Sequence, residues 1–403
     1  MEIDLADWLN LIFRWLHLIA GIAWIGTSFY FIFLDLSLRK RRQLPPGVGG
    51  EAWNVHGGGV YLMQKYTVAP EQLPEELHWF KYEAYFTFLS GFALMGVIYY
   101  WGAESFLIDP EVAELSQFEA ILISIGFLVG GWIIYDLLCR IPALEKSSLL
   151  LSAAVFVLIL LVAWGTTNVF SGRAAFVHVG AVVGSIMVAN VFFVIIPNQK
   201  VVVADLISGR TPNPSLGEEA KQRSTHNNYL TLPVLLMMVS THFPMIFAHE
   251  QSWIVVALIL IVGGIIRDYF NRKNAGAGGR VLQWQWPSAA VFMLILILFI
   301  SYDPRSFGVK GGDIPTISEV LAVTQKRCVS CHAARPTDPD FDKAPGGVRL
   351  ETAQDLRKYN AKIMKQAVQT RAMPLANRTK MTRDERDLLG FWIRSGMPGD
   401  EKK

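Results

Sequence analysis

Long apolar runs, separated by short polar segments, make up the chain as far as residue 302. A helix needs about 20 apolar residues to cross the hydrocarbon core of a bilayer, and eight runs approach that length. The pattern predicts transmembrane helices over residues 8–35, 84–101, 116–138, 148–168, 174–197, 227–247, 252–269 and 286–302. The seventh is short, and its pair Gly263 and Gly264 indicates close helix packing rather than a break. We expect an all-α fold: a polytopic membrane helical bundle of about eight transmembrane helices.

The apolar pattern stops near Asp303, in the sequence YDPRSFGVKGGDIP. The 403 residues are 52% hydrophobic and 18% charged, which is too apolar for an ordinary soluble protein. The residues beyond 303 are instead rich in Lys, Arg, Asp and Glu. We therefore predict a transmembrane domain over 1–302, a linker over 303–315 and a separate polar domain over 316–403.

Basic residues occur in every second connection between the predicted helices. These connections hold Arg39, Lys40, Arg41, Arg42, Lys65, Lys81, Arg140, Lys146, Lys200, Arg210, Lys221, Arg223, Arg272, Lys273 and Arg280, whereas the other short loops carry only Arg173. Positively charged loops of membrane proteins stay in the cytoplasm. This predicts a multi-pass protein of the bacterial inner membrane, in contact with the lipid bilayer, whose N-terminus and polar C-terminal domain lie in the periplasm. No nucleic-acid partner is expected.

The polar domain contains the motif Cys-x-x-Cys-His in the sequence KRCVSCHAAR. The thiols of Cys328 and Cys331 would bind a haem covalently, and His332 would supply one axial nitrogen to the iron. A zinc site would need a further ligand, and the sequence after residue 303 has no other Cys or His. Bacteria attach haem c outside the cytoplasm, which agrees with the side that the charge pattern predicts.

The second axial ligand of such a haem is commonly a methionine. The candidates are Met364, Met373, Met381 and Met397. We favour Met373, because Pro374 stiffens the loop after it and the sequence TRDERDLLGFWIRSG then predicts an amphipathic helix capped by Thr382. A ligand loop followed by a last helix resembles class I cytochromes c. Met397, which also precedes a proline, is the alternative.

Three histidines fall in the outer half of the predicted bundle: His17, His178 and His242. Ionisable side chains within a membrane are hypotheses for function, and neutral imidazole binds iron well. Two of the three could hold a haem b, with Arg14 beside a propionate. A copper or non-haem iron site is a less favoured variant, and hydrogen bonding to a neighbouring helix is the structural alternative.

A weak internal repeat guides the choice among these histidines. RWLHLIAGIAWIGTSFYFIFL resembles AFVHVGAVVGSIMVANVFFVII, and YEAYFTFLSG resembles HNNYLTLPVL, which aligns Tyr85 with Tyr229 and Thr87 with Thr231. Such a 4+4 duplication would place paired positions at the interface between the repeats. His17 with His178 is therefore the preferred pair of haem b ligands.

A second group of polar residues lies on the predicted cytoplasmic side, in NVHGGGVY, LHWFKYEAY and STHNNYLTLP. Glycines allow close approach of the backbone to a ligand, although three glycines in a row are also typical of a flexible turn. Amides, imidazoles and a lysine at one face would suit a flat, polar, anionic heterocycle. The candidate residues are His56, Gly58, Lys81, Thr225, His226, Asn227 and Asn228.

These segments, together with RWLHLIAGIAWIGTSFYF and the cytochrome-like tail, resemble the bacterial membrane-bound, cytochrome-c-linked urate oxidases (urate hydroxylases). The resemblance covers essentially the whole chain. It implies oxidation of urate to 5-hydroxyisourate in purine degradation, with electrons leaving through the haem and without hydrogen peroxide. The next electron acceptor would be a soluble cytochrome c or a terminal oxidase.

Within that interpretation His226 or His56 could act as the base. Thr225, Asn227 and Asn228 could bind the ring edges, Lys81 could hold the anion, and Gly58 would lie close to it. Two other classes stay open from the sequence. One is another membrane oxidoreductase, such as a quinol:cytochrome c enzyme, and the other is a transporter or haem-handling protein that carries a cytochrome tail.

Overall fold

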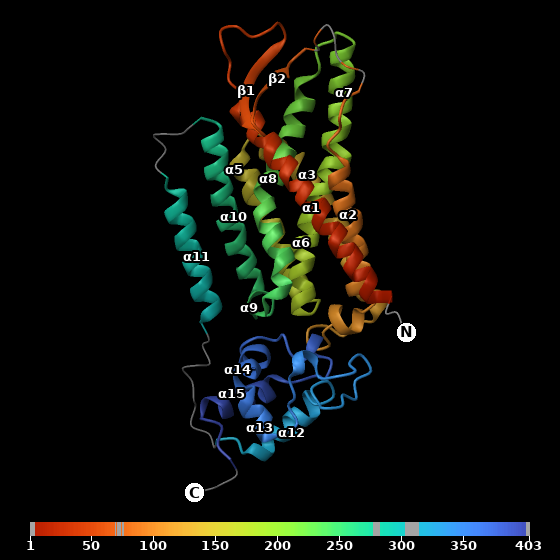
Figure 1. Ribbon diagram of the computed structural model, residues 1–403, viewed down its shortest axis with the longest axis vertical. Coiled ribbons are helices and arrows are strands. Elements are labelled where there is room, and N and C mark those ends of the chain that lie inside the picture. Colours follow the sequence, from red (N-terminus) through yellow and green to blue (C-terminus); the bar gives the residue numbers. More distant parts are fainter. Residues whose placement is uncertain are drawn as a thin grey trace.

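The computed structural model describes residues 5–68, 70, 74, 76–276, 283–302 and 314–399. A bundle of long helices forms the larger part of the molecule, and a smaller group of short helices lies against one end of it (Figure 1). The protein is mostly helical, as the sequence predicts. Most of the predicted linker, residues 303–313, lies outside the described residues.

The long helices follow the apolar runs of the sequence. Their bounds are α1 Leu5–Ser37, α2 Tyr82–Met95, α3 Gln117–Cys139, α5 Ser148–Thr167, α6 Gly172–Ala189, α7 Ile196–Ile207, α8 Pro214–Val239, α10 Ser252–Asn274 and α11 Gln285–Ser301. Two π-helical segments extend them: Gly96–Tyr100 continues α2, and Asn190–Ile195 joins α6 to α7. Short helices α4 (Pro142–Glu145) and α9 (Pro244–Phe247) lie between long ones.

Five of these elements are long and apolar enough to cross a membrane within the described parts of the chain. They are Leu5–Ser37, Gln117–Cys139, Ser148–Thr167, Gly172–Ile207 and Ser252–Asn274, and α11 is apolar but shorter. The predicted second span coincides with α2 and its π-helical extension. Such helices are compatible with a membrane protein; the prediction of about eight spans goes further than this finding.

The predicted sixth span, 227–247, differs from the structure at both ends. Helix α8 already begins at Pro214, after an Asn213 cap whose side chain accepts a hydrogen bond from the Ser215 amide at 3.1 Å. It ends at Val239, and a 3₁₀ turn over Ser240–His242 follows. Hydropathy missed the first half because that half is polar, although proline in the first turn is a common start of a helix.

The region between α1 and α2 contains a β-hairpin, which the all-α prediction did not include. Strands β1 (Val48–His56) and β2 (Gly59–Tyr66) pair antiparallel, with His56 opposite Gly59. Gly57 and Gly58 form the two-residue turn with φ of 57° and 80°. Only glycine adopts such angles readily, so the glycine run makes a tight turn, and the alternating β-branched and aromatic residues around it form the strands.

The basic connections and the C-terminal domain lie at opposite ends of the bundle (Figure 1). The starts of α1 and α3 and the end of α11 are at the end that contacts the C-terminal domain, whereas the hairpin and the turn between α7 and α8 are at the other end. The arrangement matches the alternation of loops that the charge pattern requires.

The C-terminal residues have a hydrophobic core of their own. Helices α12 (Ile317–Arg327), α13 (Ala353–Lys358), α14 (Asn360–Ile363) and α15 (Arg383–Arg394) surround Leu356, Met381 and Trp392, all of them buried. Short π and 3₁₀ segments cover Met364–Gln369, Pro345–Gly347 and Leu375–Asn377. The predicted cap of α15 is confirmed: Thr382 and Glu385 form a capping box.

Helix packing in the bundle depends on glycine at two positions. A Cβ on Gly131 of α3 would lie 2.5 Å from Val182 of α6, and a Cβ on Gly263 of α10 would lie 2.7 Å from the ring of Pro233 in α8. Their sequence neighbours Gly130 and Gly264 have open space at the same place. The predicted close packing at the Gly263–Gly264 pair is therefore confirmed, and one glycine of the pair provides it.

We expect Gly263→Ala to destabilise the bundle by about 1–3 kcal/mol, the usual cost of overpacking, because neither the proline ring nor the backbone can move aside. Gly264→Ala is the matched control and should leave stability unchanged or slightly raised, since alanine favours helix more than glycine does. Thermal unfolding of both variants in detergent measures the difference. Equal melting temperatures would contradict the packing described here.

Candidate functional site

Three consecutive residues of α8 were predicted to bind one ligand, and the structure sends them to three different neighbours. Successive residues of an α-helix differ by about 100° in direction. The Nδ1 atom of His226 lies 2.8 Å from the Tyr135 hydroxyl of α3. Asn227 faces the junction of α6 and the π-helical segment, and Asn228 faces α10. These residues therefore belong to two separate polar clusters.

The first cluster surrounds Arg223, whose side chain is 1% exposed. Its Nη2 lies 2.7 Å from Asp136 Oδ1, and its guanidinium lies over the Tyr135 ring at 5.2 Å. Asn190 donates to the Tyr135 hydroxyl at 3.1 Å and to Asn227 Oδ1 at 3.0 Å. The cluster thus ties α3, α8 and the π-helical segment together inside an apolar bundle.

Asn190 reaches this cluster from the first turn of the π-helical segment. A π segment inserts a wider turn into a helix and turns the following side chains to new directions; such segments recur at functional sites. The Asn227 amide completes the arrangement by donating to the Met187 carbonyl at 2.9 Å. His226 lies at the edge of the cluster, half-buried, with Nε2 directed away from Tyr135.

The second cluster surrounds Arg267 of α10, which is 6% exposed. Its Nε and Nη2 donate to Asn228 Oδ1 at 3.2 and 3.1 Å, and Nη2 also donates to Asn271 Oδ1 at 3.1 Å. The guanidinium stacks on Phe29 of α1 at 4.0 Å. The Nδ2 atom of Asn228 is buried and has no hydrogen-bond partner among the described residues.

The remaining residues of the predicted substrate group do not join either cluster. His56 and Gly58 are exposed at the tip of the hairpin. Lys81, just before α2, lies over the Tyr82 ring at 4.9 Å. The Thr225 hydroxyl donates to the backbone carbonyl of Lys221 at 2.8 Å, within its own helix.

The three histidines that were predicted to lie in the outer half of the membrane have separate surroundings. His17 of α1 packs on α2, with Nδ1 at 2.9 Å from the Thr87 carbonyl. His178 of α6 is fully buried; its Nε2 lies 2.7 Å from Ser124 Oγ and its Nδ1 2.7 Å from the Ala174 carbonyl. His242 is exposed in the 3₁₀ turn after α8. In the described parts of the chain, no group of three or more His, Cys, Asp or Glu is placed to hold a metal ion.

The Cys-x-x-Cys-His motif follows directly after α12 in the C-terminal domain. Both cysteines are free thiols, and burial raises the pKa of the Cys328 thiol to about 12. The Nδ1 atom of His332 lies 2.8 Å from the Val348 carbonyl. A carbonyl accepts only from a protonated nitrogen, so this bond leaves Nε2 as the nitrogen available to iron.

The loop that carries Met373 is held by one arginine of α15. Arg386 is 3% exposed, and its Nη1 donates to the carbonyls of Ala367 and Met373 at 2.7 and 2.6 Å. Its Nη2 donates to Asn377 Oδ1 at 3.3 Å. Of the other candidate ligands, Met381 is fully buried in the core of the C-terminal domain, whereas Met373 lies half-buried in the loop.

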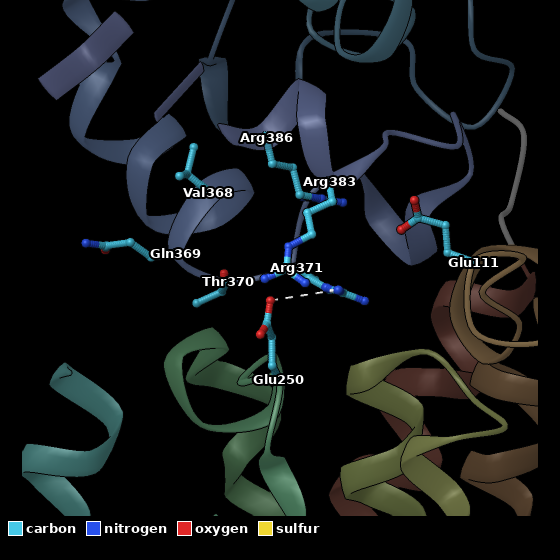
Figure 2. Close-up of a pocket in the computed structure, with 8 residues that line it drawn as sticks. All are labelled: Glu111, Glu250, Val368, Gln369, Thr370, Arg371, Arg383 and Arg386. Atoms are coloured by element: carbon cyan, nitrogen blue, oxygen red, sulfur yellow. Dashed lines mark ion pairs between the residues drawn. The ribbon is translucent and has the colours of Figure 1, made fainter. Parts of the chain in front are cut away.

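The Met373 loop is also where the C-terminal domain meets the bundle. The Arg371 amide donates to the Ala248 carbonyl at 3.4 Å, and Ala372 packs against the main hydrophobic cluster of the bundle. Figure 2 shows the cavity beside this contact, of about 240 Å³, with Arg371 and Glu250 3.8 Å apart. It is lined by Glu111, Glu250, Val368, Gln369, Thr370, Arg371, Arg383 and Arg386.

Charge is divided between the two sides of this contact. The bundle contributes Glu111 and Glu250, and the C-terminal domain contributes Arg371, Arg383 and Arg386. Burial raises the pKa of the Asp109 carboxyl. The hydrogen bond from the Glu111 backbone amide and the charges of Arg371 and Arg386 oppose this rise, and the Glu111 charge adds to it. Opposite charges of this kind fix the register of an interface.

Sequence reasoning missed four residues of these clusters: Asp136, Asn190, Arg223 and Arg267. A signal was available for two of them. Asp136 and Arg267 each lie inside a predicted transmembrane span, and a charged residue there defaults to a functional hypothesis as a histidine does. Arg223 and Asn190 gave no such signal, because one lies in a segment taken for a loop and the other is an amide.

Residues 3–301 match the family model described as urate oxidase N-terminal. The match covers the whole bundle and ends where the C-terminal domain follows. No curated protein and no solved structure matches the chain. The chain therefore belongs to the urate oxidase N-terminal family.

Proposed function

We propose that the protein oxidises urate to 5-hydroxyisourate and passes the electrons to a covalent haem in its C-terminal domain. The observation that carries the proposal is the family match over the bundle, combined with a Cys-x-x-Cys-His motif in a domain that docks on that bundle. The first supports urate as the substrate, and the second supports an exit for electrons.

The reaction balances without dioxygen. Urate and one water give 5-hydroxyisourate, two protons and two electrons. A new C5–O bond forms from the water, and the purine is oxidised. A single haem accepts one electron at a time, so the two electrons leave in two steps to a soluble cytochrome c or a terminal oxidase. Hydrogen peroxide is not a product.

The C-terminal residues fit a c-type haem. Two thiols at the required spacing follow α12, and the Val348 carbonyl orients His332 so that Nε2 is available for the iron. Met373 is the proposed second axial ligand, and Arg386 is a positioning residue for its loop. When bound, the haem supplies one-electron acceptance at the periplasmic side.

The contact between the two parts supports direct passage of electrons from the bundle to this haem. The Met373 loop both carries the proposed ligand and touches the bundle through Arg371 and Ala372. A ligand loop at the docking face brings the haem to the side from which electrons arrive.

A haem b between His17 and His178 receives no support from the contacts. Both ring nitrogens of His178 are already hydrogen-bonded, to Ser124 and to Ala174, so His178 would have to give up one bond to bind iron. We therefore assign no step to a haem b, and it stays a prediction. Pyridine haemochrome analysis, which separates haem b from haem c, decides it.

We expect urate added without oxygen to reduce the haem of the purified protein, seen as sharpening of its absorption bands. Cys328→Ala with Cys331→Ala should remove the covalent haem and the urate-dependent reduction of an acceptor, since the thiols fix the terminal iron. Full activity without covalent haem would exclude the electron-exit role. Reduction by a quinol but not by urate would favour a quinol:cytochrome c enzyme, and reduction by neither a transporter or haem-handling protein.

For the axial ligand, we expect Met373→Ala to lower the haem potential and to remove the methionine–iron charge-transfer band. Arg386→Lys should weaken that band while covalent haem is retained, because lysine cannot bind the three oxygens that Arg386 holds. Arg383→Gln, an exposed change at the same cavity, and Met397→Ala are the controls and should leave the band unchanged. Loss of the band in Met397→Ala instead would reassign the ligand.

For topology, we expect a reporter fused after Ser301 to be active in the periplasm and one fused near Arg41 to be inactive there. The reason is that the basic connections lie at the end of the bundle away from the C-terminal domain. Reporter activity in the cytoplasm at Ser301 would mean that the chain crosses an odd number of times or is inserted the other way.

A further inference from the structure

Two arginines are buried beside different faces of α8: Arg223, which belongs to α8 itself, and Arg267 of the neighbouring α10. They differ in whether a carboxylate balances the charge. Arg223 has Asp136 at 2.7 Å. Arg267 has no carboxylate at ion-pair distance among the residues that the structure describes, and the neighbouring Asp268 pairs with Arg272 instead. A buried charge without a counter-charge is strongly unfavourable, and more so within a membrane. The surroundings of Arg267 therefore favour binding of an anion.

The side chains around Arg267 offer more hydrogen-bond donors than acceptors. The Oδ1 atom of Asn228 alone accepts from Nε and Nη2 of Arg267 and from Nδ2 of Asn271, at 3.0 to 3.2 Å. The amide Nδ2 of Asn228 is buried and without a partner among the described residues. Rotating that amide by 180° would point its N–H groups at the guanidinium, so the surplus of donors stays in either assignment. A buried donor without an acceptor is rare in a native protein.

The same place offers a flat apolar wall. The Phe29 ring of α1 lies over the guanidinium at 4.0 Å. The hydrogen bonds of Arg267 use Nε and Nη2, which leaves the two N–H groups of Nη1 in the guanidinium plane for a ligand. Helix α1 buries little of its surface, with Ala20 its one buried residue in the described part, and it runs obliquely across the bundle (Figure 1).

We propose that Arg267, Asn228 and Phe29 form the binding site for the urate anion, between α1, α8 and α10. The inference rests on the proposed function and names the site of its substrate. Urate is flat, anionic at neutral pH and rich in carbonyl oxygens. Arg267 supplies the counter-charge and in-plane N–H donors, the Asn228 amide supplies a further donor, and Phe29 stacks on the ring.

An anionic lipid shares part of this chemistry, since a phosphate would also balance Arg267. It would not use a stacking ring, and the two anions differ in what an experiment sees. A lipid would be found as phosphorus bound to the purified protein, whereas urate binding is measured by titration. The site lies about 10 Å from the end of α10 opposite the C-terminal domain, at 1.5 Å per residue from Asn274.

The test measures binding apart from reaction. The haem of the whole protein is first reduced with dithionite, so that no acceptor is left, and urate is then titrated calorimetrically. Arg267→Met should raise the urate Kd roughly 10- to 100-fold, and Arg267→Lys should raise it less, because the charge remains and the planar fork is lost. Lys273→Gln, an exposed change six residues further along α10, should leave the Kd unchanged.

Asn228→Asp is a second variant that tests the site even if Arg267→Met does not fold. A carboxylate there would pair with Arg267 and repel urate, so we expect unchanged or higher thermal stability together with loss of urate binding. A purely structural role of Arg267 predicts the opposite: stability changes and the Kd does not. That pattern, or bound lipid phosphorus that disappears in Arg267→Met while the Kd stays, overturns the site.

Measurements on the wild-type protein distinguish failure of the proposed function, urate oxidation, from failure of the proposed urate site at Arg267. Wild-type protein that neither binds urate nor is reduced by it would refute the proposed function itself. Wild-type protein that is reduced by urate, with unchanged Kd in Asn228→Asp and Arg267→Met, would leave the function in place and show that urate binds elsewhere in the bundle.

Discussion

The buried ion pair between Arg223 and Asp136 is the interaction on which the placement of α8 against α3 depends. It joins α8 to α3 across an apolar interior at 2.7 Å. Loss of Asp136 would leave the buried Arg223 guanidinium with only Glu219 at 3.9 Å and would cost about 3–5 kcal/mol, whereas Asp136 also pairs with the exposed Arg140 at 2.7 Å. Asn190 and Tyr135 pack around it, and the π-helical segment exists where Asn190 must reach the pair.

That pair also fixes the rotation of α8, and the rotation sets what the rest of the helix faces. Arg223 and Asn227, four residues apart, share one face of the helix. Once this face points to α3 and α6, Asn228 must point to α10, where it meets Arg267. Close contact of Gly263 with Pro233 holds α8 and α10 together beside it. The first polar cluster therefore positions the second. Each cluster has a buried donor without a partner among the described residues, Nε of Arg223 in the first and Nδ2 of Asn228 in the second.

The sequence predicts the large features of the protein because they rest on simple physics. An unpaired backbone group in a bilayer is so unfavourable that membrane-spanning segments must be helices, and long apolar runs therefore predict them. Capping rules likewise predict the start of α15 after Thr382. His-Gly-Gly-Gly between alternating β-branched and aromatic residues is a turn signal. The glycine run alone leaves both a turn and a close approach to a ligand open, and the structure shows the turn.

The sequence does not predict which polar residues come together in the candidate site, and the reason is geometric. Adjacent residues in a sequence motif suggest a common ligand, yet in a helix they point in different directions, as His226, Asn227 and Asn228 do. Convergence depends on which helices are neighbours, and hydropathy does not give that. Charged residues inside the predicted spans mark both polar clusters, Asp136 the first and Arg267 the second.

The depth of Arg267 sets the remaining constraint on the mechanism. The hydrocarbon core is about 30 Å thick. Arg267 lies in the last two turns of α10, which ends at Asn274, and this end of α10 lies away from the C-terminal domain (Figure 1). If urate binds there and the haem lies behind the Met373 loop, as proposed, the electrons would have to cross most of the bundle, and more than one transfer step would be required. The aromatic side chains packed between the helices, with Trp24 in contact with two of the buried clusters, are the groups at that depth that can be oxidised and reduced.

A substrate site on one face and a terminal haem on the other would let the enzyme take urate from the cytoplasm while it delivers electrons to the periplasm. The helices of the bundle would then hold both sites in place and also transfer the electrons between them.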